Sequence, residues 1–152
     1  MAGERSVESL RLPVLTRYSG SVVLRCLIVD DSALFLRSAR ELLEREGVAV
    51  VGVASNSAQA LQRTEELRPD LVLVDIDLGA ECGFDVAWQL NRSGRNDSAP
   101  PVIILISSHS EEDFEEFIIE SPAVGFLSKA LLSASAIQAM MRNGGEPMVT
   151  GR

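Results

Sequence analysis

Short apolar runs alternate with amphipathic segments from Arg25 to Arg142. Runs rich in branched aliphatic residues and bounded by polar residues are typical of buried strands, and we predict strands over 25–29, 48–54, 71–74, 102–107 and 123–128. The segments between them have helical periodicity, which predicts helices over 32–47, 56–68, 83–91, 110–121 and 133–142. Ser32 and Asn56 are the expected N-caps of the first two helices, and Gly47 is the expected stop of the first.

This alternation predicts an α/β fold of five βα units. Strands without a polar face are buried on both sides, so the sheet should be parallel and covered by helices. The 152 residues suit one domain, which we place at residues 25–143. Residues 1–24 are predicted to be a flexible N-terminal extension, and residues 144–152 a polar C-terminal tail.

Composition narrows the range of possible binding partners and cellular compartments. The net charge of -8 disfavours direct binding to nucleic acid or to anionic membrane surfaces. Neither a membrane-spanning segment nor a signal peptide is evident. The two cysteines, Cys26 and Cys82, lack metal-ligand spacing and fit a reducing compartment, so we expect a cytoplasmic protein.

Polar residues of complementary chemistry stand at the ends of four predicted strands. Ligands of parallel α/β sheets bind at the carboxyl ends of the strands, so these residues should share one edge. Each alone has an ordinary explanation as a cap, a turn residue or a solvated charge, but the combination is hard to explain by capping. The set is Asp30, Asp31, Asp75, Ser107 and Lys129.

The residue types suggest phosphoryl chemistry. Crowded carboxylates repel each other unless a cation is present, and Mg²⁺ prefers oxygen ligands. Asp75 could then act as a nucleophile toward phosphorus, with Lys129 as a second cation for a phosphate oxygen. Ser107 would supply a hydroxyl donor that reports the presence of the phosphate.

The motifs at these strand ends resemble the receiver domain of two-component response regulators. They are LIVDDS at 27–32, LVLVDIDLGAECG at 71–83, VIILISS at 102–108 and GFLSK at 125–129, and the likeness extends over about residues 24–142. The resemblance implies a flavodoxin-like (βα)5 fold, in which a five-stranded parallel sheet of order 2-1-3-4-5 has helices on both faces.

The resemblance also implies a role for each matching residue. Asp75 would receive a phosphoryl group from a sensor histidine kinase, with Lys129 and Ser107 assisting. Mg²⁺ would be held by Asp30, Asp31, Asp75 and the backbone carbonyl of Asp77. The remaining matches are the switch pair Ser107 and Phe126 and the loop residues Gly83 and Ser108.

Several departures from the family pattern affect the expected site. Asp77 adds a carboxylate near it, and a solvated loop acid and a metal role for this side chain are both open. Gly79 stands where proline is frequent, which predicts a more mobile loop. Ala130 follows Lys129 in place of proline; a cis bond before alanine costs about 3 kcal/mol, so a trans bond and a different direction for Lys129 are both open. His109, the only histidine, lies near the expected rim and is expected to be solvated.

Two alternatives to a phosphorylated receiver remain. LVLVDID resembles the first motif of haloacid-dehalogenase-type phosphatases, with Asp75 as nucleophile and Asp77 as general acid. Such enzymes need an acidic pair after the lysine, whereas only Glu146 is acidic beyond Lys129. The second alternative is a pseudo-receiver that serves only as an interaction module.

The output partner is not specified by the motifs. A downstream protein or a covalently linked effector domain would each suit a receiver. The predicted helix over 110–121 is strongly acidic, and we expect Phe114, Phe117 and Ile118 to form its core face. By resemblance, the 110–142 face is the signalling surface, and a homodimer through this face is a further interaction to be tested.

Overall fold

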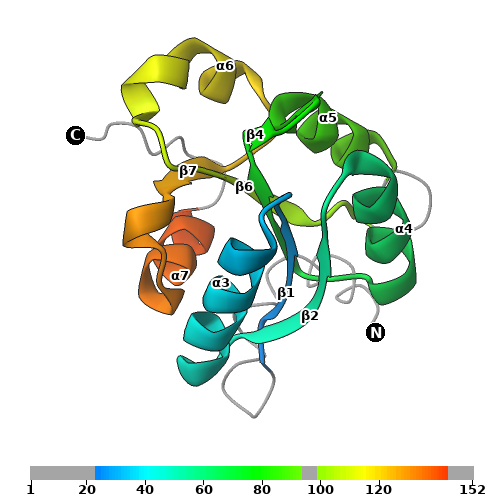
Figure 1. Cartoon of the computed structure of the whole chain (residues 1–152), viewed down its shortest axis with the longest axis vertical. Coiled ribbons are helices and arrows are strands. Elements are labelled where there is room, and N and C mark those ends of the chain that lie inside the picture. The colour runs from blue at the N-terminus through cyan, green and yellow to red at the C-terminus, as the bar shows by residue number, and fades with distance from the viewer. Residues whose placement is uncertain (1–22, 94–98, 144–152) are drawn as a thin grey trace, which may run out of the picture.

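The computed structural model of the protein describes residues 23–93 and 99–143. Most of the predicted N-terminal extension, part of the connection before residue 102, and the predicted tail over 144–152 therefore lie outside the described residues. Within the described part, strands and helices alternate along the chain as the apolar pattern predicts (Figure 1).

Five parallel strands form the central sheet in the order β2-β1-β3-β6-β7. Counted along this sheet, the order is 2-1-3-4-5, so the predicted topology is confirmed. The central strands β1, β3 and β6 are almost wholly buried, as expected of strands covered on both faces. The strands are β1 (Arg25–Val29), β2 (Ala49–Ala54), β3 (Leu71–Asp75), β6 (Val102–Ser107) and β7 (Gly125–Ser128).

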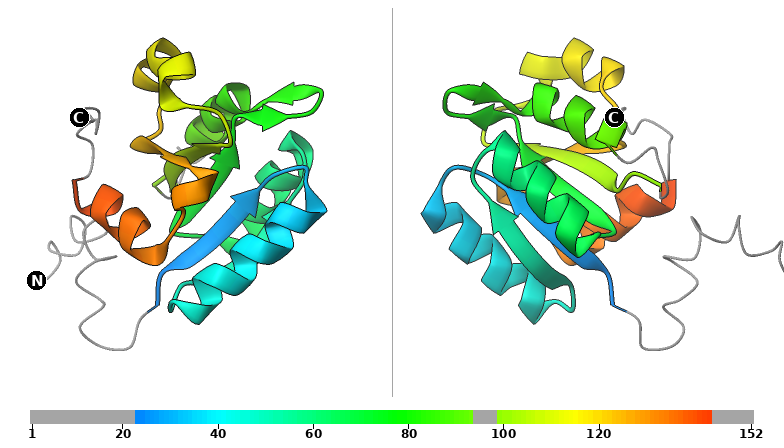
Figure 2. Two further views of the ribbon diagram at one scale, coloured as in Figure 1. Left: turned by 60° about the vertical axis from the view of Figure 1, so that its left-hand side comes forward. Right: turned by 90° about the vertical axis from the view of Figure 1, so that its right-hand side faces the viewer.

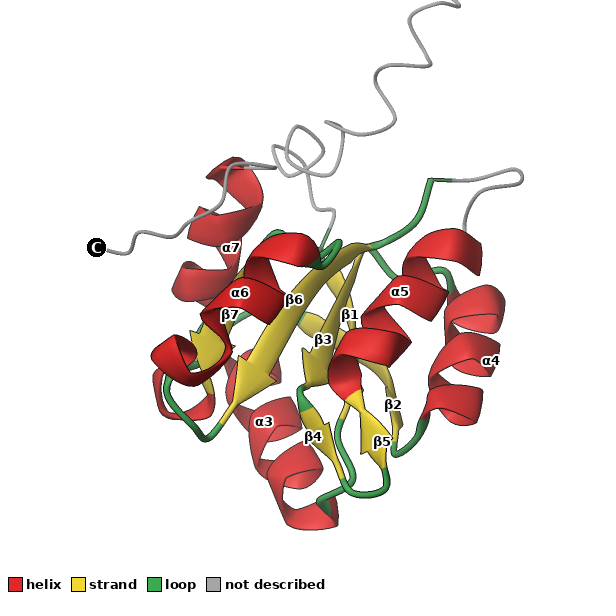
Figure 3. Ribbon diagram, turned by 90° about the horizontal axis from the view of Figure 1, so that it is seen from above, coloured by secondary structure: helices red, strands yellow, loops and turns green. Residues whose placement is uncertain are grey.

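Helices cover both faces of the sheet, two on one side and three on the other (Figures 2 and 3). The first face carries α3 (Ala33–Arg45) and α7 (Ala134–Asn143), which pack Leu43 and Ile137 against the sheet. The second face carries α4 (Ser57–Leu67), α5 (Gly83–Ser93) and α6 (Glu115–Glu120). Burial of apolar side chains on both faces supplies most of the driving force for folding.

Side chains cap the first helices as predicted. Ser32 Oγ accepts a hydrogen bond from the Phe35 amide at 3.2 Å, and Asn56 Oδ1 accepts one from the Gln59 amide at 2.9 Å. Gly47 follows the end of α3 with a φ of +97°, a left-handed conformation that favours glycine. Within residues 23–93 and 99–143, no helix is long and apolar enough to span a bilayer.

The structure differs from the predicted elements after β3 and after β6. Residues 77–82, for which no strand was predicted, form an antiparallel hairpin of β4 (Asp77–Leu78) and β5 (Glu81–Cys82). The predicted helix over 110–121 is a 3-10 turn, η2 (Glu111–Phe114), followed by the short α6. Our prediction that Phe117 belongs to the core is wrong, since 60% of it is exposed, whereas Phe114 and Ile118 pack partly against the core. Phe117 instead contacts another aromatic side chain, with its ring centroid 5.4 Å from that of Phe84.

Candidate functional site

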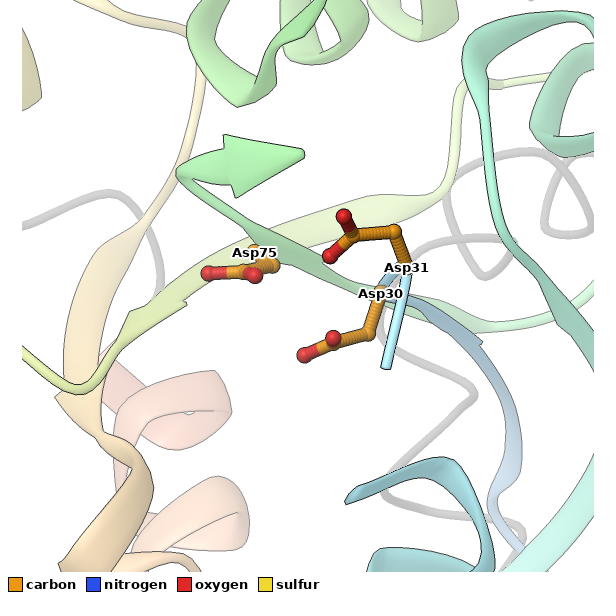
Figure 4. Close-up of side chains that lie close together, drawn as sticks. All are labelled: Asp30, Asp31 and Asp75. Carbon is orange, nitrogen blue, oxygen red and sulfur yellow. The ribbon is translucent and has the colours of Figure 1, made fainter. Parts of the chain in front are cut away.

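Three aspartates meet at the carboxyl end of the sheet. β1 and β3 are neighbours in register, with Val29 paired to Val74, so the residues that follow these two lie side by side. Figure 4 shows the carboxylates of Asp30, Asp31 and Asp75 close together. One oxygen from each lies within 4.8 Å of the others, and Asp30 and Asp75 are buried whereas Asp31 is exposed. The parallel pairing of two adjacent strands therefore creates the acidic cluster.

Lys129 joins this cluster from the end of β7. Its Nζ lies 2.8 Å from Asp30 Oδ2 and 3.4 Å from Asp75 Oδ2. The peptide bond to Ala130 is trans, yet the side chain points into the acidic cluster, so the departure from the family pattern at Ala130 does not redirect it. Lys129 begins a 3-10 turn, η3 (Lys129–Leu131), in which Ser128 Oγ accepts a hydrogen bond from the Ala130 amide at 3.2 Å.

Burial controls the ionisation of Asp75. Loss of hydration is the main reason that the pKa of Asp75 rises from an ordinary 3.8 to about 6, and the neighbouring charge of Asp30 adds to this rise. Lys129 and the Asp77 amide, which donates to Asp75 Oδ1 at 3.2 Å, oppose it. Asp75 is thus mainly ionised at neutral pH. Burial and the charge of Asp30 disfavour this ionised form, and a bound cation would offset that effect.

Lys129 remains a cation despite its partial burial. Burial lowers the pKa of Lys129, but the contacts with Asp30 and Asp75 outweigh this effect and raise the pKa above its usual value. Its charge leaves the cluster acidic, because the cluster holds three carboxylates and this amine pairs with two of them. The site can therefore accept additional positive charge.

The acidic cluster fits a hard divalent cation. Asp30 Oδ2 is buried, and Lys129 Nζ, 2.8 Å away, is its one close polar partner among the described residues. A carboxylate oxygen has more than one lone pair, so this atom can also coordinate a cation. Mg²⁺ takes such oxygens, usually from one or two carboxylates together with water. Asp30, Asp31 and Asp75 are the residues that could hold it.

The β4–β5 hairpin encloses one side of the acidic cluster. Asp77 begins the hairpin with an exposed side chain, outside the cluster that the three aspartates form among the described residues. Gly79 has a φ of +70°, and a Cβ placed on it would lie 3.0 Å from Asp31 Oδ2. Glu81 ties the hairpin to the start of α4, since its carboxylate accepts hydrogen bonds from the Ser57 amide at 2.7 Å and the Ser57 hydroxyl at 2.9 Å.

Gly83 joins the hairpin to α5 where the backbone passes close to β3. A Cβ on Gly83 would lie 2.1 Å from the backbone oxygen of Asp75, a distance that no side chain can occupy. The Gly83 amide also donates to the Ile76 carbonyl at 2.8 Å. Glycine is required here by the close approach of two backbone segments.

Of the two predicted switch residues, Ser107 lies next to the acidic cluster on the neighbouring strand but is not bonded to it. Ser107 is buried at the end of β6, and its Oγ accepts a hydrogen bond from the His109 amide at 2.9 Å. No hydrogen bond joins Ser107 to the aspartates in the part of the chain that the structure describes. Phe126 is partly buried against the core, whereas Ser108 and His109 are exposed.

One residue of the site was not predicted from the sequence. The Phe35 ring lies beside Lys129, with Nζ 4.4 Å from the ring centroid. Phe35 occupies the first turn of α3, where an apolar side chain is typical of an ordinary core position. Its contact with a residue 94 positions away depends on the packing of α3 near the end of β7, which no local spacing reveals.

Comparison with known families agrees with this geometry. The profile of the family described as "Response regulator receiver domain" matches residues 26–142. The chain belongs to the response regulator receiver domain family. The match begins within β1 and ends within α7, so it includes all five strands of the sheet and the acidic cluster. A match to receivers lends no support to the phosphatase alternative drawn from the LVLVDID motif.

Individual relatives share the receiver part of this chain. A protein-glutamate methylesterase/protein-glutamine glutaminase 5 from Myxococcus xanthus is 32% identical, over 81% of this chain and 34% of its own length. The response regulator GacA from Pseudomonas viridiflava is 30% identical, over 78% of this chain and 54% of its own length. The matched region thus spans between a third and just over half of these curated relatives.

A solved structure has the same fold. The signal receiver domain of a modulated diguanylate cyclase from Desulfovibrio desulfuricans G20 superposes with a TM-score of 0.65. It is 30% identical, and the match covers 82% of this chain and 94% of that chain. The flavodoxin-like arrangement predicted from the sequence is therefore confirmed by topology and by comparison.

Proposed function

We propose that Asp75 accepts a phosphoryl group from a sensor histidine kinase and that its phosphorylation switches a protein-interaction surface. The observation that carries the proposal is the position of Lys129, whose Nζ lies between the buried carboxylates of Asp30 and Asp75. An amine beside a nucleophilic carboxylate can pair with an oxygen of the incoming phosphoryl group. Membership of the receiver family supports the same role.

The transfer step uses the Asp75 carboxylate as the nucleophile. A carboxylate oxygen attacks phosphorus, a P–O bond forms, and the P–N bond to the kinase histidine breaks. The electron pair of that bond stays on the imidazole nitrogen, which takes up a proton from solvent. Most Asp75 is ionised and ready to react at neutral pH, because its pKa is about 6.

We assign Mg²⁺ to Asp30, Asp31, Asp75 and the backbone carbonyl of Asp77. When bound, the ion would offset negative charge on the transferring group and on the crowded carboxylates. The convergence of one oxygen each from Asp30, Asp31 and Asp75 within 4.8 Å supports this assignment. Positioning of the carboxylates is the contribution of the chain itself, through the register of β1 and β3.

The readout in this proposal begins at Ser107. Its hydroxyl leaves the turn that it forms with the His109 amide and donates to a phosphoryl oxygen on Asp75. Ser107 is paired with Ser128 on the neighbouring strand β7, which also carries Phe126. The movement of Ser107 frees space for the Phe126 side chain. Phe126 then repacks and changes the 110–142 face. Gly83 and Ser108 keep the two adjoining loops close to the site.

The receiver unit in this proposal spans residues 25–143 and lies in the cytoplasm. It acts as a signalling phosphoacceptor, and the only reactions that it catalyses are its own phosphorylation and dephosphorylation. Its partners are a histidine kinase and a downstream protein or linked effector domain. The acidic η2 and α6 favour a partner with a basic surface, because six acidic side chains and no basic ones lie between Glu111 and Glu120. A homodimer through the 110–142 face is an alternative use of this surface.

Acetyl phosphate and Mg²⁺ test the proposal without the kinase. We expect intact-mass spectrometry to show a gain of one phosphoryl group in the wild type and in Asp77→Asn, and no gain in Asp75→Asn. A gain that persists in Asp75→Asn would place the phosphate elsewhere. No gain in the wild type, while a control receiver reacts, would support a pseudo-receiver. Sustained turnover of p-nitrophenyl phosphate would support a phosphatase.

A further inference from the structure

Among the described residues, the ring of Phe35 makes the only aromatic contact to Lys129. The Nζ lies 4.4 Å from the ring centroid, within the range of a cation–π interaction. We propose that Phe35 is a positioning residue that holds Lys129 against Asp75 for phosphoryl transfer. This inference rests on the function proposed above and adds a residue to it.

Lys129 needs a positioning contact because its own backbone does not restrict the side chain. Lysine has four rotatable side-chain bonds, and ordering them costs conformational entropy. The residue that follows is alanine, and the peptide bond between them is trans. The side chain is nevertheless only 19% exposed and is held among two carboxylates and one ring.

The ring differs from the two carboxylates in one respect. Asp30 and Asp75 would change their effective charge when Mg²⁺ binds or when Asp75 becomes an acyl phosphate. A ring attracts a cation through its quadrupole, which neither event alters. Phe35 is therefore the contact that can hold Lys129 in the same place before, during and after transfer.

The position of the ring is determined by α3. Phe35 is the third residue of this helix, and its amide donates to Ser32 Oγ at 3.2 Å. Its side chain packs against the core between the sheet and the helices α3 and α7. Because α3 begins directly after the segment that carries Asp30 and Asp31, the same stretch of chain supplies two acids of the cluster and the ring that supports its lysine.

The lysine can be observed as a single site, since Lys129 is the only lysine in the chain. Selective ¹³C-lysine labelling then gives NMR signals from one side chain. We expect the ring current of Phe35 to shift the ε-methylene protons of Lys129 upfield in the unphosphorylated protein. Phe35→Leu should return these signals to ordinary lysine values, whereas Phe35→Tyr should retain the shift.

Phe117→Leu is the matched control for this measurement. It makes the same chemical change at an exposed phenylalanine on α6, and we expect no change in the Lys129 signals. Signals that are not shifted in the wild type, or that do not change in Phe35→Leu, would overturn the contact. This readout does not depend on phosphorylation, so it separates the contact from the proposed function.

A double-mutant cycle tests whether the contact matters for transfer. With acetyl phosphate and Mg²⁺, we expect Phe35→Leu to slow phosphorylation of Asp75 by about threefold to tenfold. This is the rate effect expected when the free energy of one cation–π contact is lost. Phe35→Tyr should restore the rate, and Phe117→Leu should leave it unchanged. In the Lys129→Met background, Phe35→Leu should cause no further loss, because the cation is already absent.

Equal slowing by Phe35→Leu in both backgrounds would overturn the proposal, because it would show that Phe35 acts through the fold instead of through Lys129. A wild-type rate in Phe35→Leu would also overturn it and would leave the function of Asp75 intact. A wild-type chain that takes up no phosphate would overturn the proposed function and the positioning role together. Thermal unfolding of each variant shows whether the protein folds.

Discussion

At the scale of single residues, Asp75 combines burial with a neighbouring carboxylate. Folding raises its pKa from 3.8 to about 6, so the folded chain holds this proton more tightly than the unfolded chain. Below the unfolded pKa, Asp75 is protonated in both states and costs no stability. As the pH rises from 3.8 to about 6, the unfolded chain releases this proton more readily than the folded chain, and stability is lost.

Asp75→Asn should therefore stabilise the protein without Mg²⁺ at alkaline pH. We expect the free energy of unfolding at pH 8 to rise by about 1–2 kcal/mol, a value below the full linkage energy because structural relaxation reduces the cost of burying a charge. The difference from the wild type should shrink toward zero as the pH falls to about 4. Urea titrations across this range measure it, with the exposed Asp77→Asn as control. A stabilisation that does not depend on pH would contradict the account.

The residue types at the strand ends and the meeting of Asp30 with Asp75 could be predicted from the sequence, whereas the partners of Ser107 and Lys129 that depend on side-chain packing could not. The register of two adjacent buried strands follows from their apolar pattern, so the meeting of Asp30 and Asp75 was foreseeable. The bonding of Ser107 to its own turn depends on a side-chain rotation that no pattern specifies. The placement of Phe35 beside Lys129 depends on tertiary packing between distant segments.

At the scale of elements, the junction of β3, the hairpin and α5 is the most tightly constrained. Gly83→Ala should be strongly destabilising, because its Cβ would meet the backbone of Asp75 at 2.1 Å and that of Ile76 at 2.7 Å. We expect a loss of about 2–3 kcal/mol in the free energy of unfolding, as for an overpacked core.

Gly52→Ala provides the comparison for this substitution. Its Cβ would meet the end of the Leu67 side chain at 2.8 Å, and this side chain can rotate away. We expect a cost below about 1 kcal/mol for Gly52→Ala in the same denaturant titration. Equal costs for the two variants would contradict the importance that we give to the close backbone approach at Gly83.

The predicted strands agree with the structure within a residue or two because long apolar runs have few alternatives to burial. The hairpin over Asp77–Cys82 was missed because two-residue strands are too short for any periodicity. The exposure of Phe117 was also missed. An apolar residue in a short helix can lie on the core face or at its margin, and only the packing of α6 beside α5 decides this.

At the scale of the whole molecule, the fold holds three carboxylates close together, and a bound cation would reduce the repulsion among them. Mg²⁺ should therefore stabilise the folded chain, by about 1.4 kcal/mol at ten times its Kd. A chelator should reverse the effect. Asp31→Asn should weaken the stabilisation without harming the fold, since this side chain is exposed, and Asp85→Asn should leave it unchanged. Equal stabilisation of all three proteins would indicate that Mg²⁺ binds elsewhere.

The central claim concerns one covalent bond on Asp75, and borohydride trapping tests it most directly. Reduction of an acyl phosphate converts the aspartate to homoserine, which peptide mass spectrometry can locate. After treatment with acetyl phosphate and Mg²⁺, we predict homoserine at Asp75 and at none of the other acidic positions, with none formed when Mg²⁺ is omitted. Homoserine at Asp30, Asp31 or Asp77, or none at all in a protein that has gained a phosphoryl group, would contradict the account.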